Sequence, residues 1–285
     1  MSVRETAVLV SCADEGMVGV ISHPQGAHAE TGVLIIVGAP QYRVGSHRQF
    51  VLLSRALAQA GYPAMRFDYR GMGDSCGGGR NFDAVDEDIA AAMDALKVSY
   101  PSVRRIVLWG LCDGASAALL YAQRRKDGRL AGLILANPWV HTEQAEAHAI
   151  VHAYYGQRLR EGEFWRKLLT GGVNPLRKLQ ELAKNWRNAK GGGDAGAGEN
   201  TDVFNLALAQ LRLPTLLLLC ERDTTAQRFL SYLKLIGSQL LQLAHVHRVD
   251  FAEADHTFSR AEWRAEVENA TIAWLSERNT NVVSE

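Results

Sequence analysis

The sequence predicts an α/β fold in which helices cover both faces of a mostly parallel β-sheet. Two observations lead to this fold class. Short apolar runs rich in β-branched residues alternate along the chain with stretches in which apolar residues recur every three or four positions. The chain has 285 residues, 47% of them hydrophobic and 22% charged, so it can bury a large core. Alternating strands and helices of this kind are typical of a parallel sheet buried on both sides.

The predicted strands comprise a hairpin and six core strands. The runs Ala7 to Val10 and Met17 to Ile21 are expected to pair as an antiparallel hairpin at one edge of the sheet. The core strands are expected at 33–37, 64–68, 106–109, 130–136, 215–220 and 246–251. Several are continuous apolar runs, which is the pattern of strands covered on both faces.

Helices are predicted between the strands from the spacing of their apolar residues. One contains Phe50 and ends at Gly61, and another follows Asp83, whose side chain is a candidate cap. A helix rich in small residues is expected from 113 to 122. The apolar face of the last helix is formed by Trp263, Val267, Ala270 and Trp274.

One segment interrupts the alternation of strands and helices. Residues 140–208 have a helical, polar and aromatic pattern without a convincing strand, and 190–198 form a Gly-rich stretch typical of a flexible loop. We therefore expect residues 1–139 and 209–285 to form the core, with 140–208 inserted as a helical cap or lid. Such an insertion lies at the carboxyl ends of the strands, where ligands bind in folds of this class.

The charge of the chain is balanced overall but not locally. The 31 basic and 31 acidic residues give a net charge of zero, which excludes a general nucleic-acid binder. Between Arg158 and Lys190, however, nine basic residues stand against three acidic ones, a balance of +6. Such a run is usually a solvated surface. The alternative is that it attracts an acidic glycan, a phosphorylated carrier or an anionic membrane surface.

The cysteines and the apolar runs indicate the compartment. No two of the four cysteines have C-x-x-C spacing, and no apolar run reaches the roughly 20 residues of a membrane helix. Without a recognisable secretory signal, we expect a cytoplasmic protein with reduced thiols and no transmembrane segment. His148 and His152 lie one helical turn apart but lack the glutamate of a zinc motif. No metal and no cofactor are therefore expected.

The most specific motif is Gly110-Leu111-Cys112-Asp113-Gly114, which follows a predicted strand and begins a helix. This is the nucleophile-elbow pattern G-x-S-x-G with cysteine in place of serine. The flanking glycines let strand and helix cross closely, and the helix N-terminus favours a thiolate at Cys112. The alternative is that Cys112 is only a small residue in a tight turn.

A cysteine nucleophile needs a base and a group that orients the base. Asp223 and His256 follow two later strands, so the chain order nucleophile, acid, histidine is the one expected for this kind of elbow. Cys112, Asp223 and His256 are therefore the predicted catalytic triad. Glu221 is the alternative acid, and Asp255 is interpreted as a loop residue because it adjoins His256.

The oxyanion of the reaction should be bound by two backbone N–H groups. The N–H of Asp113 is one candidate, and that of Ala39 is the other, because Pro40 has none. A simple strand-ending turn is the alternative for this second loop. Gln41, Arg43 and His47 in the same loop are candidates for substrate binding, while capping of the next helix is the alternative for the two basic residues.

These motifs together resemble the α/β-hydrolase superfamily, over nearly the whole chain. The resemblance rests on the elbow, on the late Asp and His, and on the loop Asp68-Tyr69-Arg70-Gly71-Met72-Gly73-Asp74-Ser75. More narrowly, the stretches 38–50 and 109–113 resemble the exosortase A system-associated hydrolase 1 family. That resemblance implies a bacterial protein from loci for exopolysaccharide production and PEP-CTERM protein sorting, often with a companion hydrolase encoded nearby.

Taken together, the sequence predicts a hydrolase that acts on an ester or thioester carbonyl through an acyl-enzyme. The expected partner is a small-molecule or carrier-linked acyl substrate. Two alternatives remain. One is an acyltransferase that uses the same triad on a glycan or carrier, and the other is a non-catalytic hydrolase-like protein that binds a partner. Cys112 in place of the superfamily's usual serine is the departure that keeps the second alternative open.

Overall fold

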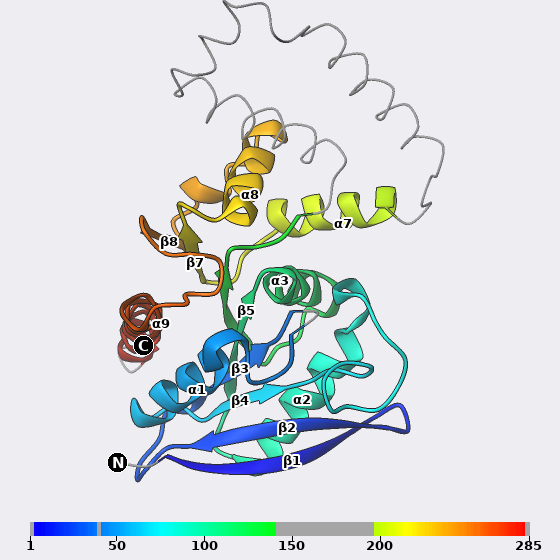
Figure 1. Ribbon diagram of the computed structural model, residues 1–285, viewed down its shortest axis with the longest axis vertical. Coiled ribbons are helices and arrows are strands. Elements are labelled where there is room, and N and C mark those ends of the chain that lie inside the picture. Colours follow the sequence, from blue (N-terminus) through cyan, green and yellow to red (C-terminus); the bar gives the residue numbers. More distant parts are fainter. Residues whose placement is uncertain (1–2, 39–40, 141–196, 283–285) are drawn as a thin grey trace, which may run out of the picture. The chain divides into compact units, whose positions relative to one another are not determined.

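The computed structural model describes residues 3–38, 41–140 and 197–282. Within these residues the strands form one eight-stranded sheet in the order β1-β2-β4-β3-β5-β6-β7-β8 (Figure 1). The strands are β1 Arg4–Cys12, β2 Glu15–His23, β3 Thr31–Ile36, β4 Ala64–Phe67, β5 Arg105–Leu111, β6 Leu130–Ala136, β7 Thr215–Cys220 and β8 Val246–Phe251. All neighbours from β4 to β8 pair in parallel, which confirms the predicted mostly parallel α/β sheet.

The edge hairpin is longer than the sequence predicted. β1 and β2 pair over nine residues each, from Arg4 opposite His23 to Cys12 opposite Glu15. Ala13 and Asp14 connect them with φ values of 47° and 64°, the left-handed pair that suits a two-residue hairpin turn. Polar and apolar residues alternate on such an edge, so the apolar runs revealed only the middle of each strand.

The central strands are buried on both faces. Every residue of β3 and β7 is buried, and so is every residue of β5 beyond Arg105. A strand without a solvated side has no reason to alternate apolar with polar residues. The continuous apolar runs therefore located these strands closely.

The helices cover the two faces in pairs. They are α1 Gln49–Gln59, α2 Asp86–Ser99, α3 Asp113–Arg125, α7 Ala197–Ala209, α8 Thr224–Leu235 and α9 Ala261–Val282. α1 and α9 contact each other on one side of the sheet, and α2 and α3 do so on the other (Figure 1). No helix in the described ranges combines the length and apolarity needed to cross a membrane.

Two predictions about helices and domains have different outcomes. The expected cap at Asp83 is wrong, because Val85 occupies the N-cap position of α2 and Asp83 lies in a short 3-10 turn before it. Three acidic residues in the first turn of α2 stabilise its N-terminus instead. Residues 141–196, which make up most of the predicted cap, lie outside the described residues, so the domain division stays a prediction.

Candidate active site

Cys112 lies at the turn between β5 and α3. Its backbone has φ 58° and ψ −124°, a conformation that costs a non-glycine residue of the order of 1–3 kcal/mol. Its N–H donates to the carbonyl oxygen of Ala136 at 2.9 Å, and its own carbonyl accepts from the N–H of Trp139 at 3.2 Å. These contacts hold the strained turn against the end of β6. The thiol is half-buried at the carboxyl edge of the sheet.

The two glycines of the elbow are required by close approach of the backbone. A Cβ atom on Gly110 would lie 2.4 Å from the carbonyl carbon of Gly114. A Cβ atom on Gly114 would lie 2.5 Å from the carbonyl oxygen of Ile36 in β3. Both distances are far below van der Waals contact. The elbow thus brings β5, α3 and the end of β3 together at Cys112.

Gly114→Ala tests this packing. Alanine normally stabilises a helix relative to glycine, by about 1 kcal/mol. Here the Cβ collides with backbone, so we expect the variant to lose about 1–3 kcal/mol of unfolding free energy, as overpacked sites do. Chemical denaturation measures this loss. Gly128→Ala is the matched control, since a Cβ there meets no atom within 4 Å. Equal stability of the two variants would contradict the crossing.

Asp223 follows β7 and caps the N-terminus of α8. Its Oδ1 accepts from the N–H of Thr225 at 3.0 Å, and its Oδ2 accepts from the N–H of Ala226 at 3.4 Å. The side chain is buried, with 5% of the residue exposed. The capping bonds fix the carboxylate in one orientation, with Oδ2 directed at His256.

His256 follows β8 and contacts both of the other predicted triad residues. Its Nδ1 lies 2.7 Å from Oδ2 of Asp223 and donates to it, because a carboxylate can only accept. The hydrogen bond to Asp223, and then a hydrogen bond with Cys112, raise the pKa of His256 to about 10, although burial opposes the rise. With Nδ1 bound to Asp223, Nε2 is the ring nitrogen that serves Cys112. The structure thus brings the three predicted residues together, with His256 hydrogen-bonded to Asp223 and close enough to Cys112 to be affected by it.

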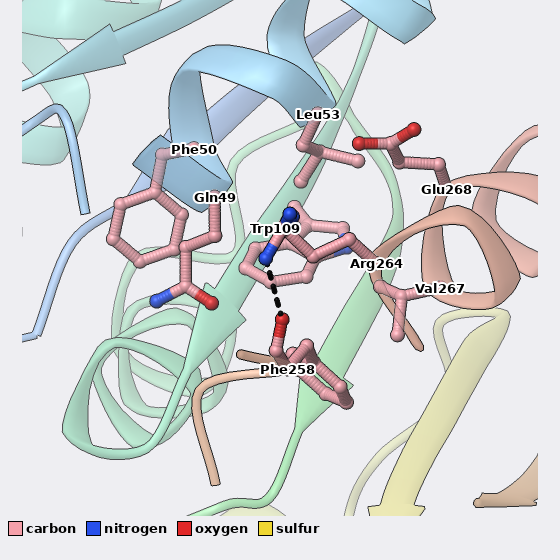
Figure 2. Close-up of a pocket in the computed structure, with 8 residues that line it drawn as sticks. All are labelled: Gln49, Phe50, Leu53, Trp109, Phe258, Arg264, Val267 and Glu268. Carbon is pink, nitrogen blue, oxygen red and sulfur yellow. Dashed lines mark hydrogen bonds between the residues drawn. The ribbon is translucent and has the colours of Figure 1, made fainter. Parts of the chain in front are cut away.

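The loop that carries His256 is fixed by its own contacts. Asp255 accepts from the N–H of Thr257 and from the N–H and hydroxyl of Ser259, as expected of a loop residue. Burial raises the pKa of Asp255, but these hydrogen bonds outweigh it and lower the pKa below its ordinary value. Arg264 of α9 donates to the carbonyl oxygen of Phe258 at 3.2 Å, beside a small pocket lined by Trp109 (Figure 2). Loop and helix therefore set the position of the imidazole together.

The alternative acid is placed away from the imidazole. Glu221 is exposed at the end of β7, and its backbone N–H bonds to Phe251 in β8. Of the two carboxylates, that of Asp223 is the one hydrogen-bonded to His256. The choice between them depends on which side chain the start of α8 turns inward.

One of the two predicted oxyanion donors lies within the described residues. Asp113 directly follows Cys112 and is the first residue of α3, so its backbone N–H lies at the N-terminus of that helix. Ala39 and Pro40 lie outside the described residues, so the role of Ala39 stays a prediction. The Gly38 carbonyl accepts from the N–H of Gln41 at 3.0 Å. A Cβ on Gly38 would collide with Oδ1 of Asp113, so Gly38 lies directly against the elbow.

The candidate substrate-binding residues differ in what they contact. Arg43 forms ion pairs with Asp68 and Asp74, so its charge is already neutralised within the protein. Gln41 accepts from the backbone N–H of Ser46 at 3.4 Å. His47 is exposed and has φ 54°. Of these side chains, that of His47 is the most accessible, and the substrate contacts of all three stay predictions.

The loop that begins at Asp68 supports the loop after β3 through hydrogen bonds and ion pairs. Asp68 is fully buried and accepts from the backbone N–H of Arg43 at 2.5 Å. Arg70 is 3% exposed and donates to both carboxylate oxygens of Asp88 in α2. Gly73 has φ 56°, and a Cβ there would collide with the Asp68 carboxylate. The motif therefore holds the loop after β3, rather than a ligand, in place.

Sequence reasoning missed the part played by Asn137. Its fully buried side chain contacts both Cys220 and His256. A polar residue directly after an apolar strand was the one available signal.

Among the described residues, no group of three or more His, Cys, Asp or Glu side chains is arranged to hold a metal ion.

The fold and site can be compared with known proteins. Among solved structures, an esterase from Pyrococcus furiosus is 17% identical, with 96% of this chain and 91% of that chain covered and a TM-score of 0.66. A serine hydrolase homologue from Coxiella burnetii is 17% identical, with 94% and 96% covered and a TM-score of 0.59. A putative hydrolase from Agrobacterium vitis is 18% identical, with 96% and 99% covered and a TM-score of 0.60. At these identities the likeness shows the shared fold.

The family is shown by a match of sequence. No curated protein sequence matches the chain. Residues 43–189, just over half of the chain, match the model of the family Hydrolase_4, described as serine aminopeptidase, S33. That match contains the elbow, and the sheet around it has the order and parallel pairing described above. The chain belongs to the Hydrolase_4 family and has the α/β-hydrolase fold.

Proposed function

We propose that this chain is a hydrolase of ester or thioester carbonyls that works through an acyl-enzyme on Cys112. The observation that carries the proposal is the pair of contacts made by His256, with Asp223 at 2.7 Å and with Cys112. A cysteine nucleophile is activated when its thiol contacts an imidazole that in turn contacts a buried carboxylate. The family is described by its serine enzymes, so the cysteine is the specific claim.

The reaction begins with transfer of the thiol proton of Cys112 to His256. The sulfur then forms a bond to the carbonyl carbon, and the carbonyl oxygen becomes an oxyanion held by backbone N–H groups, that of Asp113 and that of Ala39. As the carbonyl re-forms, the bond to the leaving group breaks, and His256 returns the proton to that group. Water then attacks the thioester with His256 as the base, and Cys112 is released as the thiol.

The raised pKa of His256 favours its protonated form beside Cys112. A protonated imidazole beside the sulfur favours loss of the thiol proton, so His256 holds that proton while the sulfur attacks. Asp223 contributes by keeping the proton of Nδ1 in place and by stabilising the positive ring.

We further propose the narrower relation to the exosortase A system-associated hydrolases. It is supported by the stretches 38–50 and 109–113, which include the predicted oxyanion loop and the elbow residues up to Asp113. The acyl substrate would then belong to exopolysaccharide or protein-sorting chemistry. The basic run between Arg158 and Lys190 suits an acidic glycan or a carrier that bears phosphate.

Trapping of the acyl-enzyme tests the proposal. We expect p-nitrophenyl acetate to add one acetyl group to the wild-type protein in intact-mass spectra, and none at this site in Cys112→Ala. Neutral hydroxylamine should remove the group from the wild type, because thioesters react with it far faster than oxygen esters. Cys112→Ser is the matched control, since its oxygen ester should resist the same treatment. The proposal fails if the wild type gives no adduct or if Cys112→Ala gives an equal one.

A further inference from the structure

Asn137 is a buried amide directly after β6. Asn137 is fully buried, and its backbone has φ 41°, which turns the chain out of the sheet. The side-chain oxygen accepts from the N–H of Cys220 at 2.9 Å. The side-chain nitrogen donates to the sulfur of Cys220 at 3.3 Å and to the carbonyl oxygen of His256 at 3.5 Å. One side chain thus contacts the strand end that leads to the acid and the residue that carries the base.

The bond from the Cys220 N–H to the Asn137 side chain replaces a backbone hydrogen bond that β6 no longer provides. β6 and β7 pair through Ala136 opposite Leu218, and the N–H of Asn137 still donates to Leu218. β7 continues to Cys220, but β6 has already left the sheet. The amide oxygen of Asn137 supplies the acceptor that the next residue of β6 would have supplied. Asn137 therefore anchors β7 three residues before Asp223.

The segment around Asn137 also contacts the nucleophile. Its neighbour Ala136 accepts the N–H of Cys112, and Trp139 donates its N–H to the Cys112 carbonyl. Ser116 of α3 donates to the Trp139 carbonyl from the other side. Residues 136–139 accordingly contact the elbow, the end of β7 and the His256 backbone within four positions.

We propose that Asn137 is a positioning residue that holds Asp223 and His256 at their pairing distance. The inference rests on the proposed function, in which this pair activates Cys112. Asn137 touches no reacting atom and acts only through the two loops. A misplacement of about 1 Å at an active site costs of the order of 10²-fold in rate, so a lost anchor should be visible in the chemistry.

Asn137→Gly is the variant that isolates the amide. Glycine adopts a φ of 41° without strain, so the backbone turn is kept while the side-chain contacts are lost. Asn137→Asp is the second variant, because it keeps the oxygen that accepts from Cys220 and tolerates the left-handed backbone. It loses the donor to His256. Cys220→Ala is the control, since it removes only the sulfur and leaves the N–H that Asn137 binds.

The test follows the His256 ring by NMR and the acylation of Cys112 by p-nitrophenyl acetate. In folded Asn137→Gly we expect the imidazole to titrate at a lower pH than in the wild type, because its contact with Asp223 loosens. We expect the acylation rate at saturation to fall about 10- to 100-fold with little change in half-saturation. Cys220→Ala should behave as the wild type in both measurements.

The two readouts separate this inference from the proposed function. A folded Asn137→Gly with the wild-type titration and the wild-type acylation rate would overturn the positioning role. If Asn137→Gly does not fold, Asn137→Asp decides: retention of the hydrogen-bonded Nδ1 proton signal of His256 and of the wild-type rate overturns it, and loss of both supports it. If the wild type never forms an acyl-enzyme, the proposed function fails, and the His256 titration still reports whether Asn137 positions the pair.

Discussion

His256→Ala is expected to slow the alkylation of Cys112 by iodoacetamide at pH 7 and its acylation by activated esters by about 10²- to 10⁴-fold. In the wild type, the imidazole stands between the thiol and the Asp223 carboxylate. Its removal deletes both the proton acceptor and the positive charge beside the sulfur. Intact-mass kinetics under single-turnover conditions give the acylation rate directly. His247→Ala, on an exposed position of β8, is the matched control and should react as the wild type.

The pH dependence of the alkylation rate should also differ between the wild type and His256→Ala. Because the pKa of His256 is raised to about 10 by Asp223 and then by Cys112, the protonated ring persists at neutral pH and is lost only as the pH rises through that value. The wild-type rate should therefore change little between about pH 7 and 9. In His256→Ala it should climb over this range, as for an ordinary thiol that titrates near pH 8.5. Identical profiles would exclude a working pair and favour a non-catalytic binding protein.

Asp223→Asn should lower the turnover of an activated ester by up to about 10⁴-fold, as removal of the charge does in other triads. An amide can donate to Nδ1 of His256, which leaves the proton on Nε2, on the side of Cys112, where an acceptor is needed. The rate falls although the geometry is kept. Steady-state hydrolysis of p-nitrophenyl acetate measures the loss.

Two controls separate this chemistry from folding. Asparagine is as good an N-cap as aspartate, so in Asp223→Asn the amide oxygen should keep the capping bond from the N–H of Thr225, and α8 should keep most of its stability. Asp223→Ala loses the cap as well and should also unfold at a lower denaturant concentration. Glu221→Gln changes the exposed neighbouring carboxylate and should keep wild-type turnover. A Glu221→Gln variant as inactive as Asp223→Asn would contradict the assignment of the acid.

The strands show how far the sequence predicts this fold. β3, β5, β6 and β7 are buried on both faces, so their apolar runs give their bounds to within two residues. The edge hairpin alternates exposed and buried residues, and the apolar runs therefore show less than its true length. Asp83 was predicted to cap a helix because aspartate is favoured at N-cap positions, but Val85 occupies the N-cap position of α2.

The candidate site, like the fold, was predicted in part from the sequence and decided in part by tertiary contacts. Chain order and the elbow pattern singled out Cys112, Asp223 and His256, because the carboxyl ends of parallel strands meet at one edge of the sheet. Order alone left Asp223 and Glu221 as alternatives. The capping bonds at the start of α8 turn Asp223 toward the imidazole, and no pattern in the sequence predicts that orientation.

Charges in the loop after β3 illustrate what only three-dimensional contacts decide. Arg43 suggested an anion-binding residue, yet its guanidinium is held by Asp68 and Asp74 from another loop. These partners lie 25 and more positions away in the sequence. A single side chain looks available for a ligand until the residue that neutralises it is known.

The sequence by itself determined the fold class, the elbow and the order of the three candidate catalytic residues, because hydrophobic periodicity and the small residues of a tight crossing are local. The tertiary structure decided which carboxylate meets His256, that Arg43 is neutralised, and that Asn137 joins the ends of β6 and β7 to the histidine loop. Those contacts join residues up to 119 positions apart, as between Asn137 and His256. Hydrogen bonds over such separations depend on how the strand ends are placed in space, and no local pattern encodes that.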